Sequence, residues 1–295
     1  MNSPEWELLL DKEVKNTLSL EKRLFSDDLK LFLENNPESF DKLKSNYHRI
    51  IHFTYNLAIC LKKGISNPLK ISILKMLHNE LFVEIDGCSP GVFREHKIEK
   101  PCPLIDSPEN SKKWMNFFEE YTNYTLENLD ITRAISRIYV LFISIEPFYE
   151  GNIIIGNIYI NFLLLALGYC NMCFKLFKIN EEKKTLSALK CSIVGIEEMF
   201  RTNCDLDFSE KVKLIEKGNY LPIEEIIYES IKETMDYLIM SSNDDLNFFS
   251  VNAIAKKLNI TEAGVKKRIK SGKLIASKLN TNKWYIFPFN IFDTY

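Results

Sequence analysis

The chain has 295 residues, of which 46% are hydrophobic, and this is enough to bury a large core. Ten glycines and ten prolines are few for this length, so the composition favours a mostly helical protein. The apolar run at 158–167 is far shorter than the roughly 20 residues that span a bilayer. The acidic N-terminus lacks the basic region of a signal peptide. We therefore expect a cytoplasmic protein without membrane contact.

Helical periodicity dominates the first 240 residues. Gly64 is typical of a helix C-cap and ends the first long pattern. Residues 84–105 interrupt the periodicity with Gly, Pro and a short alternation, so a loop or small hairpin is expected there. Helices are predicted over residues 39–64, 67–82, 111–126 and 130–145, and near 179–201, 208–217 and 221–240.

Cysteine and histidine positions give little support for a metal or redox site. Seven cysteines are scattered, and Cys170 and Cys173 form the one C-x-x-C pair, whereas a structural zinc site needs four ligands. His48 and His52 would share a helix face, but no glutamate follows the first histidine as in zinc proteases. Free thiols at a helix end are the favoured interpretation, with a redox or metal role for the pair as the alternative.

Charge is distributed unevenly along the chain. Residues 249–287 hold nine basic residues and one acid, a net of +8, which leaves −10 for the rest of a chain whose total is −2. Such asymmetry is typical of a nucleic-acid-binding module joined to a different domain. The polar stretch 241–248 separates the two regions, so we expect domains at 1–240 and 249–295 with 241–248 as a linker.

The stretch EPFYEGNIIIGN, residues 146–157, suggests phosphate chemistry. A Gly-Asn step before a helix offers backbone N–H groups and the positive end of the helix dipole to a phosphate, and Gly151 and Asn152 fit that pattern. Glu150 is a candidate Mg²⁺ ligand beside such a phosphate. The following helix is apolar nearly all round, so we expect it to lie at the centre of its domain.

The same stretch resembles the signature of the Fic family, H-P-F-x-[D/E]-G-N-G-R-x-x-R. AISRIYVLFISI and NFLLLALGY resemble the flanking helices, ILKMLHNELF and SPGVFREHKI resemble the upstream helix and the G-x-x-R flap, and EKGNYLPIEEIIYESIKETMDYL resembles the last helices. The resemblance covers roughly residues 10–240 and implies an all-α fold with a small flap hairpin. It further implies transfer of AMP from ATP to a protein hydroxyl, nucleotide contacts for Gly151, Asn152 and Asn157, and a flap residue, Arg94, beside a target chain paired as a strand.

The chain departs from this signature where the chemistry lies. The family's histidine, a general base, is Glu146 here, and a carboxylate with a reference pKa of about 4.3 is a weaker base than imidazole at about 6.5. The second glycine is Ile153, and the two arginines are Ile154 and Asn157. Phosphoryl-type transfer depends on such positioning and charge stabilisation. These residues predict an inactive AMP transferase; retained Mg²⁺ and ATP binding, or altered transfer chemistry at Glu146, is the alternative.

Residues 13–21, EVKNTLSLE, resemble the stretch IEGNTLTLE around the family's inhibitory helix, [S/T]-x-x-x-E-[G/N]. The preferred register puts Val14 at the position of the inhibitory glutamate, and an alternative register runs from Thr17 to Glu21. The implied partner is the signature's second arginine, which is Asn157 here, so an inhibitory glutamate would have nothing to inhibit.

Residues 249–287 predict a winged helix-turn-helix. Ser250 and Thr261 are placed to cap two helices, Gly272 to end the second, and residues 274–287 to form a hairpin around Asn-Thr-Asn. The pattern resembles excisionase-like, or MerR-like, DNA-binding domains, which implies a second helix in the major groove and lysines on phosphates. The expected DNA-binding residues are Thr261, Lys266, Lys267, Arg268, Lys270, Lys278 and Lys283, and the candidates for reading bases are Thr261, Glu262, Lys266, Lys267, Asn280 and Asn282.

These patterns favour a DNA-binding regulatory or toxin–antitoxin-type protein whose Fic-like domain is a scaffold, dimerisation unit or ligand sensor. One alternative is a transferase that uses Glu146 with Mg²⁺ on Glu150. Another is a protein-binding pseudoenzyme that holds a partner strand at the flap around Arg94, and a winged helix used for protein contact is the alternative for residues 249–287.

Overall fold

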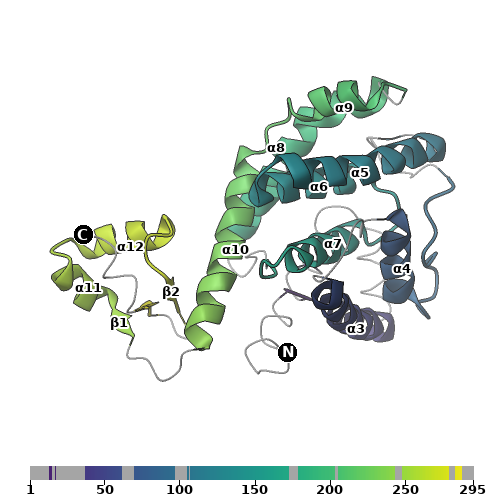
Figure 1. Ribbon diagram of the computed structural model, residues 1–295. Coiled ribbons are helices and arrows are strands. Elements are labelled where there is room, and N and C mark those ends of the chain that lie inside the picture. The colour runs from purple at the N-terminus through teal and green to yellow at the C-terminus, as the bar shows by residue number, and fades with distance from the viewer. Residues whose placement is uncertain are drawn as a thin grey trace. The chain divides into compact units, whose positions relative to one another are not determined.

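The computed structural model describes residues 13, 14, 17, 37–61, 70–96, 105, 107–172, 179–202, 205–242, 248–278 and 283–287. The chain divides into two compact units, one of residues 9–227 and one that includes residues 228–295. This division falls within a helix rather than at the expected linker 241–248, of which residues 243–247 lie outside the described part. Among the described residues, both units are built of helices apart from three strands of two residues each, so the all-α class is confirmed (Figure 1).

The central element of the first unit is α7 (Asn152–Ala166), as its apolar sequence predicts. It packs against α3, α4 and α6, and every residue from Asn152 to Leu165 is buried. The surrounding helices are α3 (Pro37–Leu61), α4 (Ile71–Phe82), α5 (Pro108–Asn128), α6 (Ile131–Ile145), α8 (Ile179–Thr202), α9 (Phe208–Ile215) and the first part of α10 (Leu221–Ser241) (Figure 1). No helix among the described residues combines the length and apolar character needed to cross a membrane.

Local signals in the sequence explain where several of these helices begin. The side chains of Ser107 and Asp130 accept hydrogen bonds from backbone N–H groups in the first turns of α5 and α6. Asp207 and Glu210 form a capping box at the start of α9. Residues 83–96 run as turns and extended chain without strand pairing between described residues, and residues 97–104 lie outside the described part.

After residue 248 the second unit holds two helices and a pair of antiparallel strands, as the sequence predicts, and a short strand, β1 (Phe249–Ser250), that was not expected. The other elements are α11 (Val251–Lys257), α12 (Glu262–Lys270), β2 (Ala276–Ser277) and β3 (Tyr285–Ile286). The strands form an antiparallel sheet in the order β1-β3-β2, and Ser250 and Thr261 cap the two helices. Ile254, Val265, Ile269, Leu274 and Ile286 form its small core.

The last turns of α10 belong to this second unit and contact its sheet. The Asp236 carboxylate forms an ion pair with Lys232 and accepts a hydrogen bond from the backbone N–H of Ala276 at 3.4 Å. Burial raises the pKa of Asp236. Tyr228 approaches Gly272, where a Cβ would lie 3.1 Å from the phenol oxygen. The Asp236–Ala276 hydrogen bond and the approach of Tyr228 to Gly272 join α10 to the strand and turn that follow α12.

Candidate functional site

The loop between α6 and α7 carries the expected phosphate motif and is tied together by its own side chains. Glu146 ends α6 in the left-handed region, with φ of 45°. The Asn152 amide closes the loop from the other end: its Oδ1 accepts from the Phe148 N–H at 3.0 Å, and its Nδ2 donates to the Phe148 carbonyl at 2.9 Å. In this structure, therefore, Asn152 shapes the loop.

Gly151 marks the point where the start of α7 meets α4. Its φ of 72° favours glycine, and a Cβ on this residue would lie only 2.4 Å from the Phe82 ring. Immediately behind it, Ile153, Ile154 and Ile155 have no exposed surface. The first turn of α7 is thus closed to solvent at these three residues.

His78 on α4 connects this loop with residues 83–96. Its Nδ1 accepts the Gly91 N–H at 2.9 Å, so the ring is neutral and Nε2 donates to the Glu150 carbonyl oxygen at 3.1 Å. The ring stacks on Phe148 with centroids 3.9 Å apart. Burial lowers the pKa of His78 to about 4. The sequence places His78 within a helix typical of the Fic family, but its bridging role depends on contacts 13 and 72 residues away along the chain.

Glu150, the expected Mg²⁺ ligand, faces the same segment. Its carboxylate accepts the Ser89 N–H at 3.2 Å, and burial raises the pKa of Glu150. The Cys88 thiol lies nearby, and burial raises its pKa to about 12. Among the described residues, no group of three or more His, Cys, Asp or Glu side chains could hold a metal, so a Mg²⁺ at Glu150 would depend on phosphate oxygens for further ligands. By resemblance to the Fic signature, Ile154 and Asn157 stand in place of two arginines, so this loop lacks those two cationic partners for the phosphates of ATP.

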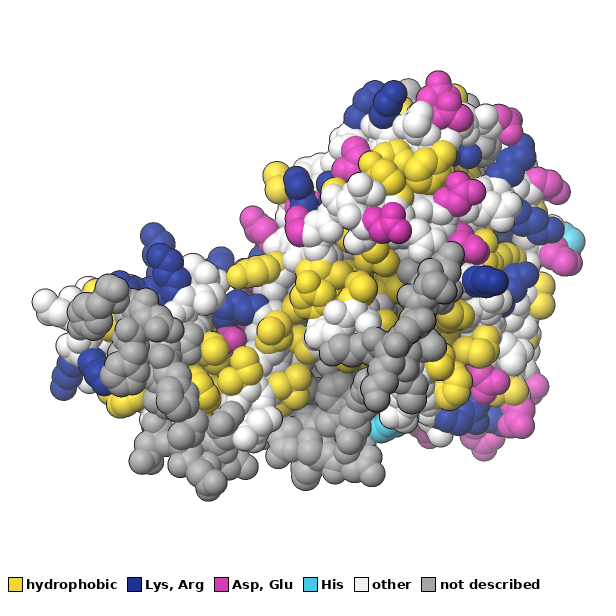
Figure 2. Space-filling model, viewed as in Figure 1, with side chains coloured by type: hydrophobic (Ala, Val, Ile, Leu, Met, Phe, Trp, Pro, Cys, Tyr) yellow, Lys and Arg dark blue, Asp and Glu magenta, His cyan; other side chains and the backbone are white. Residues whose placement is uncertain are grey.

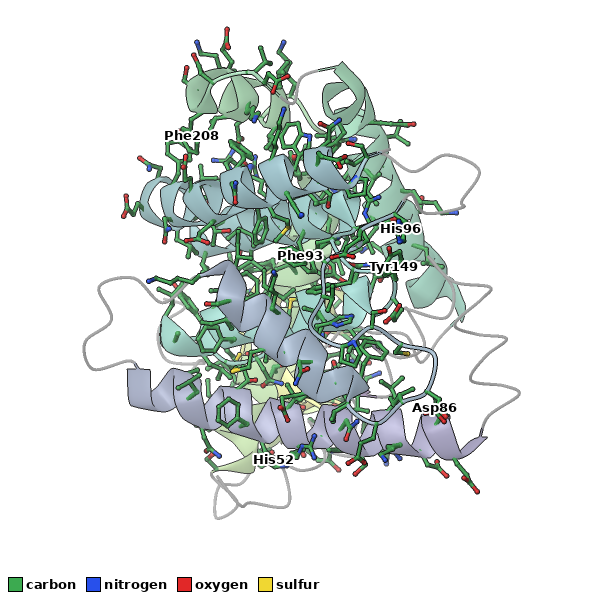
Figure 3. The ribbon with its side chains drawn as sticks, turned by 90° about the vertical axis from the view of Figure 1, so that its right-hand side faces the viewer. His52, Asp86, Phe93, His96, Tyr149 and Phe208 are labelled. Atoms are coloured by element: carbon green, nitrogen blue, oxygen red, sulfur yellow. The ribbon has the colours of Figure 1, made fainter. Side chains whose placement is uncertain are left out.

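Residues 94–96, in the flap segment expected to receive a target chain, form hydrogen bonds to the motif loop instead. The backbone N–H of Arg94 donates to the Pro147 carbonyl at 2.9 Å, and those of Glu95 and His96 donate to the Tyr149 phenol oxygen at 3.0 and 2.8 Å (Figure 3). The Arg94 side chain is 1% exposed and donates to the carbonyls of Glu146 and Ile105. These three consecutive backbone donors are therefore occupied within the chain.

Asn157, at the position of the second arginine, is 1% exposed on α7. Its Nδ2 lies 2.8 Å from Thr17 Oγ1 and 3.5 Å from a carboxylate oxygen of Glu13. Glu13 accepts further hydrogen bonds from the side-chain amides of Asn161 at 2.9 Å and Asn171 at 3.1 Å. The N-terminal residues thus meet α7 as the resemblance implies, but the carboxylate beside Asn157 belongs to Glu13. In the preferred register the residue at the inhibitory position is Val14, an apolar side chain that is buried next to Glu13. Glu21 of the alternative register lies outside the described residues.

Comparison with known proteins agrees with this arrangement. Residues 68–164, which include α4, α5, α6 and most of α7, match the model of the Fic/DOC family. The chain contains a Fic/DOC family domain. A Fic domain containing signaling protein from Bacteroides thetaiotaomicron VPI-5482 has 15% sequence identity and a TM-score of 0.56, over 77% of this chain and 87% of that one. At that identity the likeness shows a shared fold, which confirms the predicted Fic-type helical domain.

Two other solved structures were found with lower scores. Fic-1 from C. elegans is 13% identical over 74% of this chain and 67% of its own, with a TM-score of 0.48. A Fic family protein from Desulfovibrio desulfuricans G20 is 12% identical over 97% and 88%, with a TM-score of 0.42. No curated protein matches the chain. The Fic/DOC assignment therefore rests on the family match and the first structure.

The residues expected to bind DNA lie in the second unit, and they differ in exposure and in the side chains that they contact. Lys266 and Lys267 are exposed on α12, and Arg268 is half-buried. Lys270 lies 3.7 Å from the Glu229 carboxylate of α10, and Lys278 lies over the Trp284 ring at 5.3 Å. The Thr261 hydroxyl accepts the Gly264 N–H at 3.1 Å as the cap of α12, Lys283 is exposed, and Asn280 and Asn282 lie outside the described residues. Basic side chains gather on this unit in the space-filling view (Figure 2).

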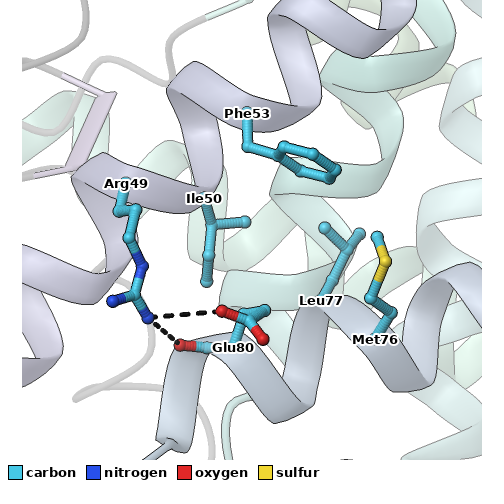
Figure 4. Close-up of a pocket in the computed structure, with 6 residues that line it drawn as sticks. All are labelled: Arg49, Ile50, Phe53, Met76, Leu77 and Glu80. Atoms are coloured by element: carbon cyan, nitrogen blue, oxygen red, sulfur yellow. Dashed lines mark hydrogen bonds and ion pairs between the residues drawn. The ribbon is translucent and has the colours of Figure 1, made fainter.

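A pocket of about 290 Å³ lies between α3 and α4, away from the motif loop (Figure 4). Arg49 donates to the Glu80 carboxylate at 3.3 Å along its edge. The lining is otherwise apolar, and none of its residues was predicted as a site: Arg49, Ile50, Phe53, Met76, Leu77 and Glu80. This pocket supplies no feature of nucleotide chemistry.

Proposed function

We propose that this protein is a DNA-binding regulator in which the Fic/DOC domain acts as a scaffold and not as a nucleotidyl transferase. The observation that carries the proposal is the concentration of nine basic residues against one acid in residues 249–287, in a chain whose total charge is −2. A polyanion is the partner that such a module meets most favourably.

The arrangement of these charges supports nucleic acid over protein contact. Lys256 and Lys257 end α11, while Lys266 and Lys267 share the exposed side of α12 and Lys273 follows it. Like charges held this closely repel one another, and DNA phosphates remove that repulsion while releasing counterions. A capped second helix with an exposed basic face is also the element that helix-turn-helix proteins place in the major groove.

The motif loop argues against the transferase alternative. A general base must reach the proton that it removes, yet Glu146 is 9% exposed at the end of α6. The charges that would stabilise a transferred phosphoryl group are replaced by Ile154 and Asn157, and both side chains are buried. No observation at this loop favours an altered transfer reaction.

Fluorescence anisotropy of the full-length chain with labelled 30-bp duplexes tests the proposal. Binding should weaken steeply between 50 and 200 mM salt, with a log–log slope of about −0.9 for each phosphate contact. Lys266→Ala with Lys267→Ala should reduce the magnitude of that slope by about 2 and weaken binding at every sequence.

The matched control removes two exposed lysines from the first unit, Lys44→Ala with Lys112→Ala, and so changes the net charge equally. This variant should keep the affinity of the unmodified protein. Absence of DNA binding at 50 mM salt, or equal losses in both double variants, would overturn the proposal.

A further inference from the structure

The single acid of residues 249–287, Glu262, is held at the start of α12 by a residue of α11. Asn252 Nδ2 donates to Glu262 Oε1 at 3.2 Å, and both residues are exposed. This hydrogen bond joins the first turns of the two helices and limits the rotamers open to the Glu262 side chain. Because Oε1 accepts from Asn252, the other carboxylate oxygen, Oε2, keeps its acceptor capacity for an outside donor.

The neighbouring side chains leave Glu262 as the polar side chain of this turn that can contact a base edge. The Thr261 hydroxyl caps α12, where it accepts a hydrogen bond from the Gly264 N–H. Ala263 is exposed but apolar, and Val265 is fully buried in the core. The next exposed polar side chains on α12 are Lys266 and Lys267, one turn further along the helix.

The negative charge of the Glu262 carboxylate is unfavourable for DNA binding by this basic module. It lies on the exposed side of a helix whose other charged residues are all basic, and it would repel the phosphates that those residues attract. Such a group weakens binding to DNA in general, so a favourable contribution of Glu262 to binding requires a specific donor. In the major groove the donor that suits a carboxylate is the exocyclic amine of cytosine, N4.

We propose that Glu262, oriented by Asn252, reads a cytosine in the DNA site of this protein. The inference rests on the proposed DNA-binding function and names one nucleobase that the module would recognise. Glu262 accepts the cytosine N4–H, while Lys266 and Lys267 hold the phosphate backbone. Contacts with phosphates position the module, and this one contact with a base edge sets its preference.

A purely structural role for Glu262 makes different predictions. An acid in the first turn stabilises a helix through the helix dipole, and the bond to Asn252 strengthens the link between the two helices. Under that role, substitutions change thermal stability but leave the base preference intact. Under the proposed role, the base preference changes even in variants that keep the fold and the charge.

The experiment is selection from a randomised 20-bp duplex library with the full-length protein, followed by competition binding with single-base variants. The unmodified protein should enrich cytosine at one position, with a discrimination of about 10-fold against the other bases. Glu262→Gln should abolish that preference and tighten binding to unselected DNA. Asn252→Ala should weaken the preference without any change in charge.

Two further variants separate the explanations. Glu262→Asp keeps the negative charge at the helix start but withdraws the carboxylate by one methylene, so the preference should fall while thermal stability is retained. Glu120→Gln, an exposed charge-matched change in the other unit, should leave the preference unaltered. An unchanged cytosine preference in Glu262→Gln and Glu262→Asp overturns the inference. Absence of binding by the unmodified protein overturns the proposed function itself.

Discussion

Arg94 donates its Nε–H to the main-chain carbonyl oxygen of Glu146 at 2.9 Å. By resemblance these two residues occupy the positions that would face a protein target and remove its proton. Here they are bonded to each other, and both are buried. The pair fastens residues 83–96 to the motif loop and so contributes to the packing of the Fic/DOC domain.

The first prediction concerns transfer chemistry. The unmodified protein should transfer no label from ATP to protein, and Glu146→His should not restore transfer, because Ile154 and Asn157 still replace both arginines. Calorimetric titration with Mg–ATP should give no heat up to millimolar nucleotide. Micromolar binding that Glu150→Lys abolishes would contradict this expectation and return the transferase alternative to consideration.

The second prediction concerns acid stability. Burial holds His78 neutral, with its pKa lowered from 6.5 to about 4, so the unfolded chain binds a proton more readily than the folded one between these values. Its contribution to the free energy of unfolding is complete above pH 6.5 and should decline by about 3 kcal/mol as the pH falls to 4.

Urea unfolding of the unmodified protein and of His78→Gln at pH 7 and pH 4.5 measures this effect. The variant should be less stable at pH 7 and should lose less stability on acidification. Comparison of the two proteins cancels other titrating groups, including Glu150, whose raised pKa acts in the opposite direction. Equal losses in both proteins would show that His78 is not the group that titrates.

The third prediction concerns Gly151. An alanine there must hold a left-handed backbone and place its Cβ against the Phe82 ring, so Gly151→Ala should destabilise the Fic/DOC domain by about 2–4 kcal/mol. A double-mutant cycle with Phe82→Leu, read by urea unfolding, separates the two causes. The double variant should be more stable than the sum of the single changes predicts, because the smaller side chain relieves the contact. Simple additivity would assign the whole cost to the backbone.

The fourth prediction compares a buried ion pair with an exposed one. Arg137 on α6 is buried, donates to the carboxylates of Glu216 and Glu224 at 2.9 and 2.6 Å, and lies over the Tyr220 ring. Removing it leaves carboxylates unpaired at a partly buried site, so Arg137→Ala should cost about 3 kcal/mol in the free energy of unfolding. The control is Lys113→Ala, which breaks an exposed pair with Asp205 and should cost less than about 1 kcal/mol. Similar costs in the two variants would contradict the argument from burial.

The sequence by itself determined the helical class, the central position of α7 and the elements of the C-terminal unit. These follow from local rules: apolar residues on every side of one helix, and Ser250 and Thr261 at N-cap positions. The linear motif also shows, by resemblance to the Fic signature, that Glu146, Ile154 and Asn157 stand where a histidine and two arginines are expected.

Only the tertiary structure decided what the retained motif residues do. Asn152 closes its own loop, His78 joins two segments, and Tyr149 takes the backbone donors of residues 95 and 96. It also placed Glu13 beside Asn157 and Asn252 beside Glu262. Asn152 bonds to Phe148 only four residues away, but the other contacts join residues 10 to 144 positions apart, and the physical reason is that such separations have no fixed relation to helical periodicity. Their partners emerge only when the helices pack and buried polar groups must find hydrogen bonds.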